Sequence, residues 1–191
     1  MTADRSAPSA AASIVILGAS GDLARRKLVP ALFELHRQGQ LAPETAVVGF
    51  SRSVDGDEAW RADLKAALAS FGGGGPDEEE WRGFAARLAH VRGALREAPS
   101  FAELKARLEA VEAERGLPGN RLFYLAIPPS GIGDAAAHLA EAGLVHPVEP
   151  AGPWARLVVE KPFGHDLASA RALNEQLRAR FRESQLFRID H

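Results

Sequence analysis

Short apolar runs alternate with amphipathic stretches along this chain. Near-continuous apolar runs are typical of strands buried on both faces. Such runs, the third of them weak, lie at residues 13–17, 45–50, 90–95, 121–127 and 155–161. Apolar residues with helical spacing follow them at residues 23–35, 57–71, 100–116, 134–143 and 166–181. This alternation predicts an α/β fold of Rossmann type, with a doubly wound, mostly parallel sheet and helices on both faces.

Two local signals refine the predicted helices. Ser100 followed by Glu103 forms the pattern of a capping box, and Gly116 with Pro118 supplies a stop for the same helix. The low-complexity stretch 71–80 is predicted to be a surface loop that precedes a further helix.

Length and composition indicate one compact domain. With 191 residues and 46% hydrophobic side chains, the chain is expected to form one domain over residues 13–191 after a disordered segment, residues 1–12. The absence of cysteine excludes disulfides and thiolate metal sites and fits a cytoplasmic protein. A net charge of −2 gives no reason to expect nucleic acid as a partner, and no apolar run is long enough to predict a membrane span.

A glycine turn separates the first predicted strand from its helix. Gly18 permits a sharp turn, Gly21 permits close approach of a pyrophosphate, and the Ser20 hydroxyl can donate to a phosphate oxygen. The dinucleotide fingerprint GxGxxG is matched imperfectly, because Ser20 and Leu23 stand at its second and third glycines. Read as GxxGxxA, ending at Ala24, the segment keeps the turn, the approach and the small packing residue. A purely structural turn remains the alternative.

Arg52 follows the second predicted strand. In a doubly wound fold this strand ends beside the adenosine ribose, where an acidic side chain would accept from the 2′-hydroxyl and an arginine would pair with a 2′-phosphate. The first acid after the strand is Asp55. The sequence therefore favours NADP over NAD, the alternative being that Arg52 is a solvated loop residue.

Five segments in order resemble glucose-6-phosphate dehydrogenases. They are GASGDLA (18–24), VVGFSRS (47–53), RLFYLAIPP (121–129), VVEKPFGHDL (158–167) and RIDH (188–191). The resemblance implies the N-terminal coenzyme domain of an oxidoreductase that transfers hydride from glucose 6-phosphate to NADP, giving 6-phosphogluconolactone in the pentose phosphate pathway. It also implies a homo-oligomer whose interface lies on a larger second β+α domain, which is absent from these residues.

The same resemblance assigns roles to individual residues. Arg52 is placed on the 2′-phosphate, Ala126 along the coenzyme, and Lys161 between the nicotinamide and the sugar. Asp190 would orient a catalytic histidine, and His191 would bind the substrate phosphate. The family's prolyl bond after the lysine, at Pro162 here, is commonly cis. The residues placed around the pyrophosphate are Gly18, Ser20, Gly21, Asp22 and Leu23.

The chain also departs from the family. Family members continue past RIDH and supply the histidine base later, so we expect these 191 residues to bind NADP without turnover. In "PPSGIGD" this chain has Gly131 and Ile132 where some relatives carry an aromatic residue near the coenzyme. His165 follows the EKPFG segment and receives no catalytic role.

Two other functions remain open. One is a catalytically inactive NADP-binding or interaction module, with a separately encoded second domain as its candidate partner. A short-chain reductase would need a Tyr-x-x-x-Lys pair, and the only tyrosine, Tyr124, has Pro128 at the lysine position. No clustered His, Asp and Glu spacing predicts a metal site.

Overall fold

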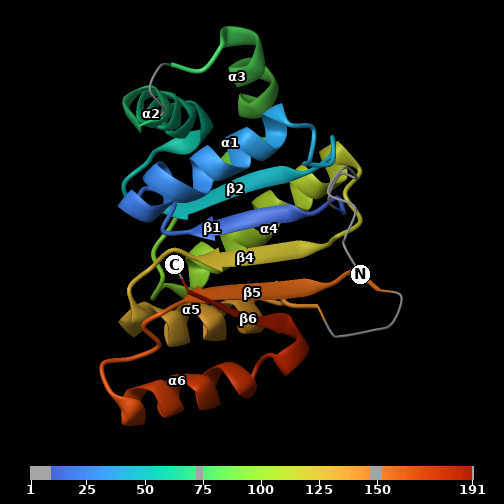
Figure 1. The fold of residues 1–191 in the computed structure, drawn as a ribbon. Coiled ribbons are helices and arrows are strands. Elements are labelled where there is room, and N and C mark those ends of the chain that lie inside the picture. The colour runs from blue at the N-terminus through green and yellow to red at the C-terminus, as the bar shows by residue number, and fades with distance from the viewer. Residues whose placement is uncertain (1–9, 72–74, 147–151, 191) are drawn as a thin grey trace, which may run out of the picture.

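Six parallel strands form one sheet at the centre of the molecule (Figure 1). The computed structural model describes residues 10–71, 75–146 and 152–190. The strands are β1 (Ser13–Leu17), β2 (Ala46–Ser51), β3 (Leu88–Arg92), β4 (Arg121–Leu125), β5 (Ala155–Glu160) and β6 (Leu186–Ile189). Their order, β3-β2-β1-β4-β5-β6, is that of the doubly wound dinucleotide-binding fold.

Helices cover both faces of the sheet, as predicted. The π-helical turn η1 (Ala24–Leu28) leads into α1 (Val29–Arg37), and α2 (Gly56–Phe71) and α3 (Glu78–Ala85) complete this layer. The opposite layer consists of α4 (Ala98–Arg115), α5 (Pro129–Glu141) and α6 (Leu167–Arg178). The 3-10 turn η2 (Glu183–Gln185) precedes β6.

Each layer has its own hydrophobic core. Phe50, Phe101 and Phe123 are buried between the sheet and α4–α6. On the other face, Trp60 of α2 lies flat on Gly49 of β2, where an added Cβ would lie 2.6 Å from the indole ring. The missing side chain at Gly49 therefore lets α2 approach the sheet closely.

The structure corrects three local predictions. Residues 186–189 form β6, whereas the sequence pattern predicted no strand there. Helix α5 starts at Pro129, five residues earlier than predicted. Ser100 does not cap a helix, because α4 begins at Ala98 and the Ser100 hydroxyl accepts from the N–H of Ala94 instead. Gly116 ends α4 with φ of 65°, as predicted.

The two residues directly before β1 are hydrogen-bonded to other parts of the domain. Residues 1–9, which include most of the segment predicted to be disordered, lie outside the described residues. The carbonyl of Ala11 accepts from the Asn120 side chain, and that of Ala12 accepts from the N–H of Ala46. Residues 72–74 of the predicted glycine-rich loop also lie outside the described residues, and Asp77 caps the helix α3 that follows.

Half of one sheet face carries no helix among the described residues. The buried cluster under α1–α3 contains residues of β1, β2 and β3 but none of β4, β5 or β6. On the bare half, Phe187 is 41% exposed, and the Arg156 guanidinium lies 4.3 Å from the Trp154 ring centroid and 5.5 Å from that of Phe187. This bare face, defined by Trp154, Arg156, Phe187 and the half-buried Tyr124, remains open to a partner.

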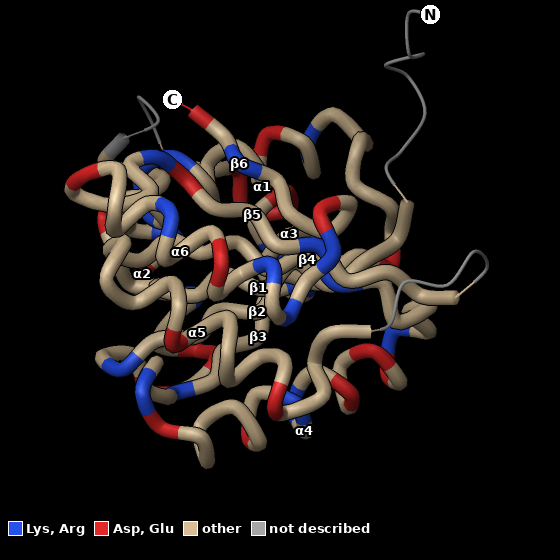
Figure 2. Tube along the Cα trace, turned by 90° about the horizontal axis from the view of Figure 1, so that it is seen from below, with Lys and Arg blue, Asp and Glu red and all other residues tan. Residues whose placement is uncertain are grey.

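Basic and acidic residues are interspersed along the trace in the view of Figure 2. Within the described ranges, no helix combines the length and hydropathy needed to cross a bilayer.

Candidate functional site at the carboxyl edge of the sheet

The strand order reverses between β1 and β4, and in this fold ligands bind at the carboxyl ends of such strands. Gly18 leaves β1 here with φ of +89°, and its N–H donates to the carbonyl of Phe50 in β2 at 2.9 Å. A Cβ at Gly18 would lie 2.2 Å from the carbonyl oxygen of Ala126, which follows β4. The predicted turn thus depends on glycine for both its backbone angle and its contact with β4.

Some backbone N–H groups of this turn donate hydrogen bonds within the fold, and others do not. The N–H groups of Gly18 and Ala19 donate to Phe50, and that of Gly21 donates to Gly18 at 2.8 Å. Among the described residues, the backbone hydrogen bonds outside helices and strands include none donated by the N–H groups of Ser20, Asp22 or Leu23, as is usual for amides at the start of a helix. The π-helical turn η1 follows at once.

The residues at this turn fit a dinucleotide. The positive end of the helix and its free amides suit a pyrophosphate. Gly21 has no Cβ; one added there would lie 3.0 Å from the Gly18 carbonyl oxygen and would narrow the approach. The Asp22 carboxylate is turned to Arg26, with 2.9 Å between Oδ1 and Nε, so its charge is partly neutralised.

The loop after β2 lies against the glycine turn. The Ser53 hydroxyl donates to that of Ser20 at 2.9 Å, which joins the two loops. Arg52 is exposed, and its side chain has no hydrogen bond or ion pair with any described residue. Arg92, at the end of β3, forms an ion pair with Asp55 over 3.7 Å. The site thus contains an exposed guanidinium, that of Arg52, which is available to bind a phosphate group.

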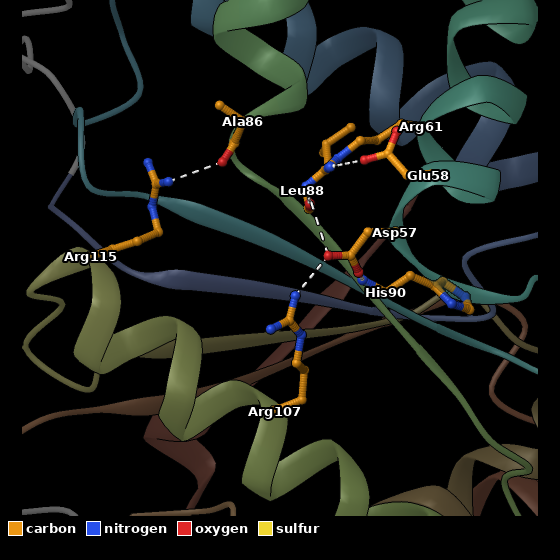
Figure 3. A network of polar contacts seen from close by, with 8 residues as sticks. All are labelled: Asp57, Glu58, Arg61, Ala86, Leu88, His90, Arg107 and Arg115. Atoms are coloured by element: carbon orange, nitrogen blue, oxygen red, sulfur yellow. Dashed lines mark hydrogen bonds and ion pairs between the residues drawn. The ribbon is translucent and has the colours of Figure 1, made fainter.

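A network of polar contacts centred on Asp57, which lies in the first turn of α2 directly after this loop, connects α2 and α4 to β3 (Figure 3). Its Oδ1 accepts from the N–H of His90 in the edge strand β3 at 2.7 Å, and its Oδ2 accepts from Arg107 of α4 at 2.7 Å. Arg61 of α2 donates to the Leu88 carbonyl at 2.7 Å. The network satisfies outward-facing backbone groups of β3. Sequence reasoning missed it, because its residues are widely separated along the chain.

His90 is buried beside this network. Its Nε2 lies 2.9 Å from the Ser51 hydroxyl, and its Nδ1 is buried without a described partner. Burial lowers the pKa of the imidazole, and the carboxylates of Asp57 and Asp55 oppose this shift. His90 therefore packs as a neutral ring against Trp60.

Lys161 and Asp190 meet at the ends of β5 and β6. The Lys161 ammonium lies 2.7 Å from Oδ2 of Asp190, and both side chains are more than half exposed. The Lys161–Pro162 peptide bond is cis, as the resemblance implied. The structure thus brings two of the predicted site residues together, while His191 lies outside the described residues.

Tyr124 and Glu160 form a pair next to Lys161 that the sequence did not reveal. The Tyr124 hydroxyl donates to Oε1 of Glu160 across β4 and β5. Burial, together with this hydrogen bond, raises the pKa of the Tyr124 phenol. The strand alternation places both side chains on the bare face, a relation that becomes visible only once strand register is known.

Gly131 and Ile132 lie in the first turn of α5, where Ile132 is buried in the core. In the segment where some relatives carry an aromatic residue near the coenzyme, Ile132 of this chain therefore packs in the core. Among the described residues, no group of three or more His, Asp or Glu side chains could hold a metal ion.

Comparison with known proteins agrees with this geometry. Residues 15–191 match the family "Glucose-6-phosphate dehydrogenase, NAD binding domain". The chain is 40% identical to glucose-6-phosphate 1-dehydrogenase 2 of Mycobacterium bovis over 183 residues, 93% of this chain and 34% of the relative. It is also 40% identical to the Bacillus subtilis glucose-6-phosphate 1-dehydrogenase, over 94% of this chain and 35% of that protein.

Two solved structures are similar over nearly the whole chain. A glucose-6-phosphate dehydrogenase in complex with its substrate glucose 6-phosphate has a TM-score of 0.82 and 39% identity, covering 97% of this chain and 37% of that one. The Mycobacterium avium enzyme has a TM-score of 0.79 and 31% identity, over 94% and 36%. The chain spans about a third of the length of the curated relatives it matches. It belongs to the glucose-6-phosphate dehydrogenase family, through that family's NAD-binding domain.

Proposed function

We propose that this chain is the NADP-binding part of a cytoplasmic glucose-6-phosphate dehydrogenase. The observation that carries the proposal is the juxtaposition, at one sheet edge, of the glycine turn and an exposed arginine after the next strand. The amides of Ser20, Asp22 and Leu23 would bind the pyrophosphate, and Arg52 would bind the 2′-phosphate. Ala126 would lie along the coenzyme, because it follows β4 at the switch point.

The ends of β5 and β6 would supply the sugar-side groups. NADP, when bound, accepts the hydride from C1 of glucose 6-phosphate. Lys161 carries three donors, so it can keep one on Asp190 and direct the others to coenzyme and sugar oxygens. Asp190 would then position both Lys161 and the family's histidine base, and His191 would contact the substrate phosphate.

Coenzyme binding tests the proposal directly. Calorimetric titration of the chain with NADP should show binding, and Arg52→Ala should weaken it about tenfold, the scale of a charged hydrogen bond reduced by exposure. Affinity for NAD, which lacks the 2′-phosphate, should change little and serves as the internal control. Equal losses for both coenzymes would contradict the role of Arg52, and no NADP binding by the native chain would contradict the proposal itself.

A second candidate function, a binding module without activity of its own, is favoured by the bare face. Phe187, which is 41% exposed, and Trp154 both lie against the Arg156 guanidinium there and form a partly exposed aromatic surface. The relatives are about three times as long as the matched region, so we propose that the occupant is the remaining part of a glucose-6-phosphate dehydrogenase, supplied in the same or a separate chain.

A complementation experiment separates the two functions. The chain is mixed with glucose 6-phosphate and NADP, alone and with a polypeptide containing the unmatched C-terminal part of the Bacillus subtilis relative. We expect no reduced coenzyme from the chain alone, and a complex with turnover after mixing. Phe187→Glu should weaken that complex, whereas Glu109→Gln on the opposite helical layer should not. Turnover by the chain alone would refute the inactive module, and absence of a complex would refute the assigned occupant.

A further inference from the structure

We infer that Arg92 is a second cation for the 2′-phosphate of NADP, and that Asp55 opposes it and limits the preference for NADP over NAD. This inference rests on the proposed coenzyme role of the carboxyl edge. It concerns two residues to which neither the sequence motifs nor the family resemblance assigned a function.

Strand pairing places Arg92 beside the loop that contains Arg52. Ser51 and Arg92 are register partners in β2 and β3, and the N–H of Gly93 donates to the Ser51 carbonyl at 3.0 Å. The two strands therefore run together to the point where Arg52 begins the loop.

Side-chain alternation decides which face Arg92 occupies. Val91 packs into the core beneath α4, so its neighbours His90 and Arg92 point to the face of α2. His90 contacts the Ser51 hydroxyl on that face. The loop residues Ser53 and Asp55 lie on the same side, since Ser53 reaches Ser20 and Asp55 reaches Arg92.

The pairing of Arg92 is weak enough to be exchanged. Its Nη1 lies 3.7 Å from Oδ1 of Asp55, and the two side chains are 65% and 88% exposed. Exposed ion pairs at such a distance contribute little to stability. A phosphate with nearly two negative charges attracts a guanidinium more strongly than one carboxylate does, and it offers a matching fork of oxygens.

The local charge then determines coenzyme choice. Arg52 and Arg92 carry two positive charges against the single negative charge of Asp55, which favours a phosphate. Asp55 also repels that phosphate, and its oxygens can accept from the ribose hydroxyls of NAD. The three side chains together predict preference for NADP with residual acceptance of NAD.

Affinities for NADP and NAD, measured by calorimetry on the native chain and single variants, test this inference. Arg92→Ala should raise the Kd of NADP about three- to tenfold, as expected for an exposed charge on a phosphate, and change that of NAD less than about twofold. Arg92→Lys should retain only part of the affinity, since the charge remains but the guanidinium fork is lost. Asp55→Asn should tighten NADP binding and weaken that of NAD. Arg96→Ala is the matched control, because Arg96 is 78% exposed and pairs with Asp134 instead.

The outcomes separate the two levels of the argument. If Arg92→Ala binds NADP as Arg96→Ala does while Arg52→Ala binds it weakly, the role of Arg92 is wrong and the proposed function stands. An unchanged ratio of NADP to NAD affinity in Asp55→Asn overturns the role of Asp55. If the native chain binds neither coenzyme, the proposed function and this inference fail together.

Discussion

Gly18 and Gly21 are three residues apart, but the structural reason for a glycine differs between the two positions. Gly18 has a positive φ, and an added Cβ would meet the Ala126 carbonyl at 2.2 Å, a backbone atom that cannot move aside. At Gly21 the nearest atom to an added Cβ, the Gly18 carbonyl oxygen, is 3.0 Å away, and φ is not positive. The fold therefore requires the first glycine, whereas the role we propose for the second is to leave room for the pyrophosphate.

This difference predicts opposite phenotypes for two alanine variants. Gly18→Ala should lower the free energy of unfolding by about 2–4 kcal/mol, from backbone strain plus the steric clash. Gly21→Ala should cost about 1 kcal/mol or less but weaken NADP binding. Urea unfolding and calorimetry on both variants measure the contrast. A Gly18→Ala protein as stable as the native chain would show that the turn can relax.

His90 makes stability depend on pH. Its imidazole pKa is lowered by burial, whereas the unfolded chain has the ordinary value of 6.5. Below pH 6.5 the unfolded state binds a proton that the folded state resists, so stability should fall from pH 6.5 downward until the folded-state pKa is reached. Above pH 6.5 both states are neutral and His90 contributes no slope.

His90→Gln removes this contribution. Between pH 7.5 and pH 5.5 the native chain should lose more unfolding free energy than the variant, because only the native chain carries the buried imidazole with the lowered pKa. Urea titrations at the two pH values supply the comparison, with His165→Gln, an exposed site, as control. Parallel losses in native chain and variant would show that His90 accepts its proton freely in the fold.

At the scale of elements, the edge strand β3 depends on side chains from both helical layers. Asp57 of α2 accepts from the His90 N–H and from Arg107 of α4, so its carboxylate links β3 to both helical layers. Such capping protects an edge strand from pairing with other chains. The same residue lies in the first turn of α2, directly after the loop that carries Arg52 and Asp55.

Asp57→Ala should therefore loosen β3 specifically. The His90 amide should lose protection against hydrogen exchange, and stability should drop by about 1–3 kcal/mol, the penalty for unsatisfied buried partners. Glu58→Gln, one residue on and 89% exposed, should change neither quantity. Retained protection at His90 in Asp57→Ala would show that water replaces the carboxylate without loss.

The elements also show where sequence patterns suffice and where they fail. The five predicted apolar runs overlap β1–β5, although the weak third run, 90–95, begins two residues after β3 does. Burial on both faces explains the continuous apolar run of β2, whereas β4 and β5 border the bare face and were found from their apolar and β-branched residues. β6 escaped prediction because Phe187 and Arg188 are exposed on an edge strand beside the bare face. The pairs Lys161–Asp190 and Tyr124–Glu160 required knowledge of register, which a single sequence does not contain.

At the scale of the whole molecule, the candidate site and a buried ion pair lie at opposite ends of the strands. The candidate site lies at the carboxyl ends of the strands. At the amino ends, Arg121 of β4 forms a bidentate pair with Glu112 of α4 over 2.7 and 2.8 Å, and the Ser13 hydroxyl of β1 donates to the same carboxylate. Arg121 also donates to the Leu144 carbonyl after α5. This buried pair ties β1, β4, α4 and α5 together.

Breaking that pair tests the separation of the two edges. Glu112→Gln leaves the Arg121 charge, 4% exposed, without its counter-ion, and should lower the unfolding free energy by about 3–5 kcal/mol. Glu109→Gln, one turn earlier on the exposed side of α4, should leave stability unchanged. Because the carboxyl edge is built from other contacts, the folded Glu112→Gln protein should bind NADP as tightly as the native chain in calorimetry at low temperature. A loss of coenzyme affinity in a variant shown to be folded would mean that the amino-edge pair also shapes the glycine turn, through the β1 and β4 strands that both edges share.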